Sequence, residues 1–271
     1  MSTRAQSRPS KRGIQSIEVG GRLLQVLVER GTPMMLRDLA AAGGMPAAKA
    51  HRYLVSFIRM GLAEQDTQTG RYDLGEFALR LGLVGLARMD PVRLGAPVLV
   101  DLCDEIEETC ALAVWGNHGA TVVRWEEPAR AVTVNLRTGG VLPLLTSATG
   151  LCFAAFFPAA QSEKLLRTEL TELRRNPHAT GPRTYEQAQG LLAMIRKRGL
   201  SRIDGTLIPG VAAFSAPVFG PDGRMVLALT ALGHAGAFDT RWTGRIASAL
   251  RQSAANLSKR LGAGKYSTGS N

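Results

Sequence analysis

Cysteine is scarce in this chain of 271 residues, which holds only Cys103, Cys110 and Cys152. These three form no CxxC pair and no cysteine–histidine cluster, a pattern that argues against a disulfide framework and against a structural zinc site. We therefore expect buried structural thiols in a reducing compartment, with no metal and no cofactor. A redox or metal sensor acting through these thiols is an alternative that their spacing disfavours.

Long apolar runs are also missing. No segment reaches the roughly 18 consecutive apolar residues that suggest a transmembrane helix. The N-terminal stretch MSTRAQSRPSKRG is basic, but no apolar stretch follows it, so it does not resemble a secretory signal. The sequence therefore predicts a cytoplasmic protein without membrane association.

Acidic residues are outnumbered, and most strongly at the front of the chain. There are 33 Lys and Arg against 22 Asp and Glu, a formal net charge of +11. The first 60 residues hold ten basic and three acidic residues, a net +7 of that total. A basic front end of this kind indicates a polyanionic partner such as nucleic acid.

Signatures of catalysis are absent from the sequence. The four histidines, His51, His118, His178 and His234, form no HExxH pair, and no nucleophile elbow or phosphate-binding glycine loop is present. We therefore expect no enzyme. A small-molecule-processing enzyme is the alternative from another class, and turnover of a bound ligand would support it.

Residues 44–62, GMPAAKAHRYLVSFIRMGL, predict an amphipathic helix with two distinct faces. The apolar residues recur at helical spacing, as expected for a core contact: Ala50, Leu54, Phe57 and Ile58. A second set, here called the cationic stripe, has the same spacing: Lys49, Arg52, Ser56 and Arg59. A solvated helix face usually mixes charge signs to form i,i+4 pairs, so a stripe without acids indicates contact with phosphate or an acidic partner.

The segments around this helix complete a small domain. An apolar pattern at Ile17, Leu24, Leu27 and Val28 predicts a preceding helix, although Gly20 and Gly21 within it are unfavourable. Residues 36–44 predict a short second helix. After the amphipathic helix, 62–65 and 71–74 read as strands joined by the turn DTQTG, with Arg71 at the tip. This order is that of a winged helix-turn-helix.

The rest of the chain predicts a leucine-rich linker helix and then an α+β domain. The linker covers 74–90, and Pro91 ends it. Helices are expected at 92–107, 147–157, 161–175, 184–198 and 240–261, and strands at 109–116, 120–127, 131–137, 211–220 and 224–233. Strands, then helices, then strands again indicate an antiparallel sheet.

Four stretches, in this order, carry a family resemblance. They are LRDLAAAGGMP with AKAHRYLVSFIRMGL, TGRYDLG, VNLRTGGVLPLLTSATGL, and RGLSRIDGTLIPGVAAFSAPVFGPDGRMVLAL. Over residues 14–262 the chain resembles the IclR-type transcriptional regulators. The resemblance implies an α+β protein with an N-terminal winged helix-turn-helix, a linker helix and a C-terminal GAF-like antiparallel-sheet effector domain.

The resemblance also implies a division of the chain and a set of partners. The expected segments are a flexible basic arm (1–13), a DNA-binding domain (14–75), a linker helix (76–91), an effector-binding domain (92–262) and a disordered tail (263–271). The expected partners are double-stranded DNA with a pseudo-palindromic operator, a small-molecule effector, and a second copy of the chain. In this family the homodimers often assemble further into tetramers.

In the family, the start of the recognition helix reads bases. The matching positions are Ala47, Ala48, Lys49, His51 and Arg52. Relatives often carry Ser or Thr in place of the two alanines, and alanine offers DNA only a contact with a thymine methyl group. Arg52 reads bases or holds phosphate, His51 contacts DNA or acts as a spacer, and Arg59 reads as a solvated charge. Arg71 in the wing is expected to contact phosphate.

The resemblance places the effector over the sheet, under the loop around 142–150. The matching residues are Leu142, Ser147, Ala148, Thr149, Gly150, Ile203, Ala213, Thr230 and Leu232. Backbone N–H groups at this loop and helix start suit a carboxylate. The alternative is that the loop only turns the chain.

Relatives that sense small oxo acids carry more polar side chains in this pocket. Here Thr206 replaces a usual Glu, and Leu151 replaces a common Lys. We therefore expect a larger, partly apolar effector such as an aromatic acid or ester. Trp115, Trp125 and Phe214 offer stacking surface, with core packing as the alternative role for each.

The function that follows is a ligand-responsive regulator of transcription. We favour repression of a neighbouring catabolic or transport operon, relieved by the effector, and activation is the alternative.

Overall fold

The computed structural model describes residues 13–87, 89–128, 138–176, 178 and 180–264. The expected strand at 131–137 lies outside the described residues, as do nearly all of the expected arm and tail. The chain divides into two compact units, residues 1–89 and 90–271. No helix among the described residues is long and apolar enough to cross a lipid bilayer.

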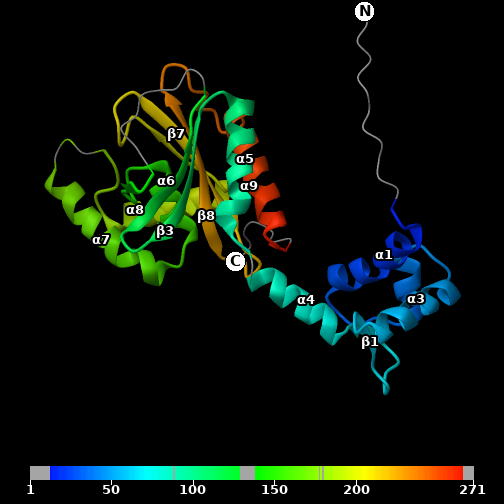
Figure 1. The fold of residues 1–271 in the computed structure, drawn as a ribbon. Coiled ribbons are helices and arrows are strands. Elements are labelled where there is room, and N and C mark those ends of the chain that lie inside the picture. The colour runs from blue at the N-terminus through cyan, green and yellow to red at the C-terminus, as the bar shows by residue number, and fades with distance from the viewer. Residues whose placement is uncertain (1–12, 88, 129–137, 177, 179, 265–271) are drawn as a thin grey trace, which may run out of the picture. The chain divides into compact units, whose positions relative to one another are not determined.

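The described part of the first unit, from residue 13 onward, contains three helices, a hairpin and a fourth helix (Figure 1, blue to cyan). The helices are α1 (Gln15–Arg30), α2 (Leu36–Ala42) and α3 (Ala47–Arg59). Strands β1 (Ala63–Gln65) and β2 (Tyr72–Leu74) pair antiparallel, with Glu64 opposite Asp73. Helix α4 follows at Glu76–Ala87. This is the predicted winged helix-turn-helix with its linker helix.

The core of the first unit is small. Its buried apolar residues are Leu23, Leu27, Leu39, Ala40, Ala50, Leu54, Ala63 and Tyr72. Gly20 explains how α1 reaches α3, because a Cβ atom there would lie 2.7 Å from Cδ1 of Tyr53. Three residues of the expected apolar stripes lie outside this core instead: Ile17, Val28 and Ile58 are exposed. The apolar periodicity predicted the helices correctly but overestimated how many of their apolar residues are buried.

Helix α4 leaves most of its apolar surface exposed. Phe77, Leu79, Leu81, Leu83 and Val84 are each at least 42% exposed. Surface helices normally bury one apolar stripe, so the exposure of these five side chains is unusual for a described helix.

Within its described residues, the second unit is built on a six-stranded antiparallel sheet in the order β5-β4-β3-β8-β7-β6. The strands are β3 (Thr109–Gly116), β4 (Gly119–Glu126), β5 (Val141–Leu142), β6 (Ser201–Asp204), β7 (Val211–Phe219) and β8 (Met225–His234). The long β7–β8 hairpin turns at Gly223, which has φ +73°. The α+β class with an antiparallel sheet is confirmed.

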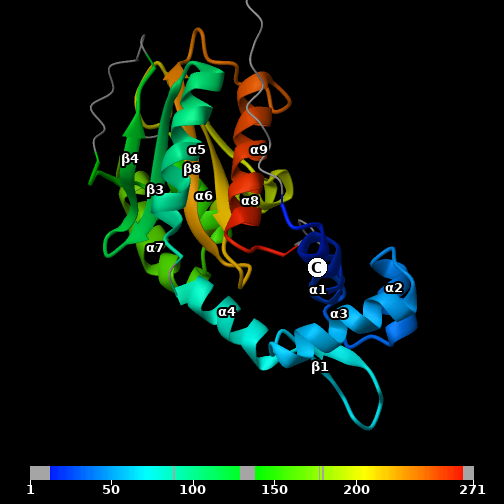
Figure 2. The same cartoon turned by 45° about the vertical axis from the view of Figure 1, so that its right-hand side comes forward.

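Helices cover both faces of this sheet (Figures 1 and 2). Helices α5 (Pro91–Ile106) and α9 (Arg245–Arg260) lie side by side on one face. Helix α6 (Ala148–Phe156) packs on the other face, with α7 (Ala159–Arg175) and α8 (Tyr185–Arg198) beside it. Helix α6 is buried over most of its length, so its residues fill the layer between the sheet and the outer helices.

Two short strands and one helix boundary differ from the sequence prediction. Strands β5 and β6 are too short to produce a recognisable alternation, and the prediction missed both. Helix α9 begins at Arg245 rather than near residue 240. The preceding residues form a turn instead, in which Asp239 accepts hydrogen bonds from the backbone N–H and from Nε of Arg241.

Candidate nucleic-acid interface and ligand cavity

Helix α3 exposes the side chains that the sequence marked for contact with DNA. Ala50 and Leu54 anchor the helix in the core, both 0% exposed. The exposed residues on its first two turns are Ala47, Ala48, Lys49, His51 and Arg52. The helix is therefore held by one side while its N-terminal half presents two cations and two small side chains outward.

The cationic stripe carries no ion pair within the described residues. Lys49, Arg52 and Arg59 are exposed, and none has a carboxylate within ion-pair distance in the described chain. The hydroxyl of Ser56 donates back to the carbonyl oxygen of Arg52, at 3.2 Å. The positive charge of the stripe is thus open to an external anion such as DNA phosphate.

The hairpin is tied to the helices by two contacts. His51 Nδ1 lies 3.5 Å from the hydroxyl of Tyr72, so this histidine bridges α3 to β2 while its ring stays exposed. Arg71 donates from Nη1 to the carbonyl oxygen of Pro33, at 3.2 Å. The expectation that Arg71 sits at the wing tip is therefore wrong. It follows the turn, and its side chain lies back against the loop before α2.

The wing tip itself is formed by the turn Asp66–Gly70. Asp66 Oδ1 accepts from the backbone N–H of Gln68 and of Thr69, at 2.7 and 3.0 Å. The N–H of Thr69, and then that of Gln68, lower the pKa of Asp66 below its ordinary value. Gly70 completes the turn with φ +70°, a conformation that favours glycine.

The second unit contains a largely apolar cavity with about 430 Å³ of empty space, including its open mouth. Its lining residues are Ala111, Val122, Trp125, Leu142, Ser147, Ala148, Thr149, Ile203, Leu207, Ile208, Val211, Ala213, Thr230 and Leu232. None of these described residues carries a charge. This lining suits a small organic ligand with few polar groups.

The sequence-predicted pocket residues come together in this cavity, with one exception. Gly150 is not among the lining residues. It is a steric requirement instead, because a Cβ atom there would lie 1.9 Å from the carbonyl oxygen of Pro143. Glycine at this position lets α6 pack directly under the 143–147 loop.

Two threonine hydroxyls form the polar wall of the cavity. Thr149 Oγ1 and Thr230 Oγ1 lie 2.8 Å apart, and both residues are buried. Thr230 donates to Ser215 Oγ at 2.9 Å, and Ser215 donates to the carbonyl oxygen of Leu229 at 3.2 Å. Because the single O–H of Thr230 donates to Ser215, the Thr230 oxygen accepts a hydrogen bond from the hydroxyl of Thr149. The chain of hydroxyls thus links α6 to the centre of the sheet.

The first turn of α6 borders the same wall. Ser147 caps the helix, accepting from the N–H of Gly150 at 2.8 Å and donating to the carbonyl oxygen of Pro143 at 2.6 Å. Within the described chain, the N–H groups of Ala148 and Thr149 have no acceptor. The positive end of the helix dipole and these two donors favour an anionic group of a ligand.

A carboxylate from α7 holds the loop above the cavity. Glu169 accepts from the backbone N–H groups of Leu144 and Leu145, at 2.7 and 2.9 Å. Burial raises the pKa of Glu169 above its ordinary value, and these two hydrogen bonds oppose that shift. Glu169 therefore positions the segment that connects Leu142 with Ser147.

The aromatic residues proposed for stacking divide into two groups. Trp125 lines the cavity, and its Nε1 donates to Glu127 at 2.7 Å. Trp115 stacks on Phe157 with ring centroids 4.8 Å apart, and Phe214 is fully buried against Phe238. Trp115 and Phe214 therefore belong to the packing, as the alternative reading held.

Sequence reasoning missed part of the lining and overvalued two positions. Leu207 and Ile208 line the cavity from the β6–β7 connection, although nothing in their spacing indicates it. Neither Thr206 nor Leu151 is among the lining residues, and Leu151 lies in the core. The side chains at positions 151 and 206 therefore do not set the polarity of the cavity lining.

The three cysteines are buried. Burial raises the pKa of each thiol, and for Cys110 the nearby Cys103 adds to the rise. A raised pKa keeps a thiol protonated and therefore unreactive toward oxidants. These properties disfavour the redox-sensor alternative.

Two family models match the chain. The model for the IclR helix-turn-helix domain covers residues 16–67, and the model described as "Bacterial transcriptional regulator IclR C-terminal" covers residues 85–259. The matched segments include α3 in the first case and the whole ligand cavity in the second.

Individual relatives agree with these models. The transcriptional repressor IclR of Escherichia coli is 28% identical over 78% of this chain and 77% of its own length. The glycerol operon regulatory protein of Streptomyces griseus is 31% identical over 94% of this chain and 99% of its own. The crystal structure of Pseudomonas aeruginosa HmgR is 44% identical and superposes with a TM-score of 0.85, covering 93% of this chain and all of that one. Both family models describe transcriptional regulators, and the curated relatives are transcriptional regulators. These comparisons therefore do not support the enzyme alternative.

Proposed function

Because this chain belongs to the IclR family of bacterial transcriptional regulators, we propose that it represses a neighbouring catabolic or transport operon until an effector binds. The observation that carries this proposal is the pairing of one exposed helix with one apolar cavity. Helix α3 presents Lys49 and Arg52 without described acidic partners, and the second unit encloses a space for a small molecule. One unit suits DNA and the other suits a ligand.

For recognition of DNA, Ala47, Ala48, Lys49, His51 and Arg52 are the residues we assign to the DNA interface. Arg52 reads bases, since a guanidinium matches the two acceptors of guanine. His51 is held by Tyr72 and fixes the orientation of the wing. Arg71 meets backbone phosphate after its bond to Pro33 breaks.

The effector that this cavity suits best is an aromatic acid or a related partly apolar molecule. Apolar walls and the ring of Trp125 suit an aromatic body. The N–H groups of Ala148 and Thr149 suit its carboxylate, because no described lining residue supplies a positive charge. A small 2-oxo acid would leave most of the apolar surface without a contact.

The working form that we propose is a homodimer acting in the cytoplasm, where its DNA lies. The exposed apolar residues of α4 suit a second copy of that helix. A two-fold dimer requires a pseudo-palindromic operator. The effector must bind two arrangements of the dimer with different affinity, since equal affinity would shift no equilibrium.

The DNA-binding part is tested by fluorescence anisotropy with a labelled duplex from upstream of the gene and with a random duplex, at several salt concentrations. We expect Arg52→Ala to weaken operator binding by about 10- to 100-fold, the usual range for a bidentate base contact. Arg59→Ala, at the far end of the same helix, is the matched control. An equal loss on both duplexes would mean that Arg52 holds only phosphate. Equal, weak binding of the unaltered protein to both duplexes would contradict a specific operator in this segment.

The ligand part is tested by thermal shift with benzoate-type acids and with pyruvate and glyoxylate. We expect the aromatic acids to raise the melting temperature and to release the operator. Stabilisation by the 2-oxo acids alone would overturn the assignment of an aromatic effector while leaving the family unchanged.

A further inference from the structure

Three arginines gather around Trp242, outside the ligand cavity. The guanidinium carbon of Arg198 lies 4.3 Å from the centroid of the Trp242 ring, and that of Arg202 lies 4.5 Å from it. Arg251 donates from Nη1 to the carbonyl oxygen of Trp242, at 2.7 Å. We call Arg198, Arg202, Arg251 and Trp242 the arginine cluster. Its members come from α8, β6, α9 and the loop before α9.

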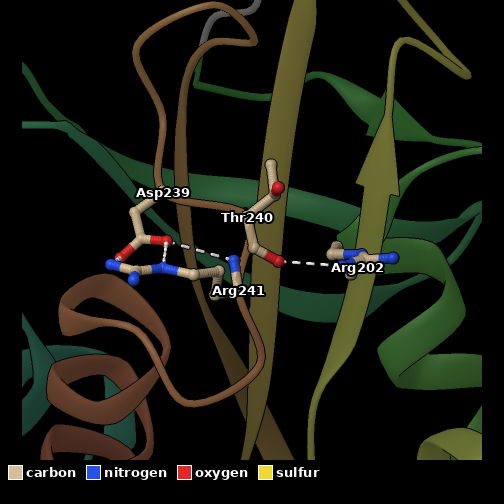
Figure 3. A network of polar contacts seen from close by, with 4 residues as sticks. All are labelled: Arg202, Asp239, Thr240 and Arg241. Carbon is tan, nitrogen blue, oxygen red and sulfur yellow. Dashed lines mark hydrogen bonds and ion pairs between the residues drawn. The ribbon is translucent and has the colours of Figure 1, made fainter.

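The arginine cluster has no acidic partner among the described residues. In the loop before α9, the carboxylate of Asp239 is occupied by Arg241, with two hydrogen bonds of 2.8 and 2.9 Å (Figure 3). Asp204 follows Arg202 on the exposed side of β6 but forms no ion pair with the cluster within the described chain. The positive charges are therefore gathered without being neutralised.

The charges of Arg198 and Arg251 repel each other. Burial lowers the pKa of Arg251, and the positive charge of Arg198 lowers it further. Stacking on Trp242 and the negative end of the α8 dipole hold the guanidinium groups in place, but neither supplies an anion. A bound oxyanion would remove the repulsion and would meet donors that are already positioned.

Each guanidinium retains free donors for such an anion. Arg202 uses Nη1 for the carbonyl oxygen of Thr240, at 2.8 Å (Figure 3). Arg251 uses Nη1 for the carbonyl oxygen of Trp242. Arg198 has only its stacking contact within the described residues. An arginine carries five N–H donors, so most of the donors of the cluster remain available.

We propose that the arginine cluster binds the phosphate or carboxylate groups of a small anionic molecule. This site is separate from the ligand cavity but shares a strand with it. Along β6, Arg202 faces the cluster on the exposed side, and the next residue, Ile203, is buried and lines the cavity. In the sheet Arg202 pairs with Phe214, which lies 5.7 Å from the Trp242 ring, and Ile203 pairs with Ala213 of the cavity wall.

The test uses the full-length protein, with isothermal titration and thermal shift as readouts. Inorganic phosphate and citrate are the two probes, and sodium chloride keeps the ionic strength constant. We expect saturable binding of at least one of them, weakened at least tenfold in the double variant Arg198→Gln, Arg202→Gln. Binding of phosphate alone or of citrate alone identifies the oxyanion.

Two further variants keep the result interpretable. Arg224→Gln, an exposed arginine in the β7–β8 turn, is the matched control and should bind as the unaltered protein does. The double variant Arg198→Lys, Arg202→Lys keeps the positive charges but removes the planar guanidinium groups with their paired N–H donors. We therefore expect it to bind with an intermediate affinity. No saturable heat with either probe, or equal binding by the glutamine variant and the unaltered protein, would overturn the proposal. Because the effector plays no part in these titrations, their failure would leave the proposed repressor function intact.

Discussion

The two units of this chain place their candidate sites in opposite ways. In the first unit the site residues project from one helix, and Lys49 and Arg52 are exposed. In the second unit Thr149, Thr230 and Ile203 are 3%, 4% and 7% exposed, and they come from three different elements. A DNA-binding surface needs only one helix whose opposite face packs on a core. A cavity for a small ligand needs several elements packed around it.

The cores of the two units differ accordingly. The core of the first unit consists mainly of a few leucines and alanines packed between three helices. Each buried side chain therefore contributes a large share of the stability of this unit. The second unit packs a six-stranded sheet between helices on both faces. The first unit should therefore be the more sensitive to a single cavity-forming substitution.

Leu54→Ala should produce the largest effect. Leu54 is fully buried on α3, and truncating such a leucine usually costs about 2–5 kcal/mol. We expect the first unit to lose its unfolding transition in calorimetry. Operator binding should be lost with it, and ligand binding should be retained. Leu250→Ala on α9, also fully buried, is the control and should lower the other transition. A single transition lowered by both variants would show that the units unfold together.

The first unit could be predicted from the sequence almost entirely, and the reason is local. Helical spacing of Ala50 and Leu54 fixes which side of α3 is buried, and this leaves Lys49 and Arg52 exposed. The error at Arg71 arose because turn position does not determine where a long side chain lies. Its contact with Pro33 joins residues 38 positions apart.

The cavity was accessible to sequence reasoning only through the family resemblance. Its residues approach one another through pairing of distant strands, for example Ala111 opposite Thr230 and Ile203 opposite Ala213. No periodicity encodes such pairings, and β6 itself is too short to be recognised. Leu207 and Ile208 were missed for the same reason, since they sit in an irregular connection.

Thr149→Val should weaken ligand binding with little effect on DNA binding in the absence of ligand. The variant keeps the shape of the side chain but removes the hydroxyl that Thr230 accepts from. The Thr149 oxygen keeps lone pairs for a donor on the ligand, and one such hydrogen bond contributes about 1 kcal/mol, so we expect roughly a fivefold rise in Kd for a hydroxylated aromatic acid, measured by titration calorimetry. Ser56→Ala is a control that removes an exposed hydroxyl from the other unit. An unchanged Kd would place the ligand away from the threonine wall.

Glu169→Gln should flatten the dependence of stability on pH. Burial raises the pKa of Glu169, so the folded state binds this proton more tightly than the unfolded state does. The contribution of Glu169 to stability therefore falls as pH rises from its ordinary value of 4.5 through the raised one. The difference in melting temperature between variant and unaltered protein, measured across that window, isolates the effect. Glu186→Gln, exposed on the neighbouring helix α8, should leave the profile unchanged.

Lys49→Ala should have the smallest effect, and it separates the two kinds of site most directly. A lysine on phosphate releases about one counterion, so the slope of log Kd against log salt should become shallower by about one. The loss should be the same on operator and random duplex, unlike that of Arg52→Ala. The cavity variant Thr149→Val should leave the slope as it is, because no described lining residue is charged. A loss confined to the operator would instead show that Lys49 reads a base, and the exposed face of α3 would then carry two base-reading cations.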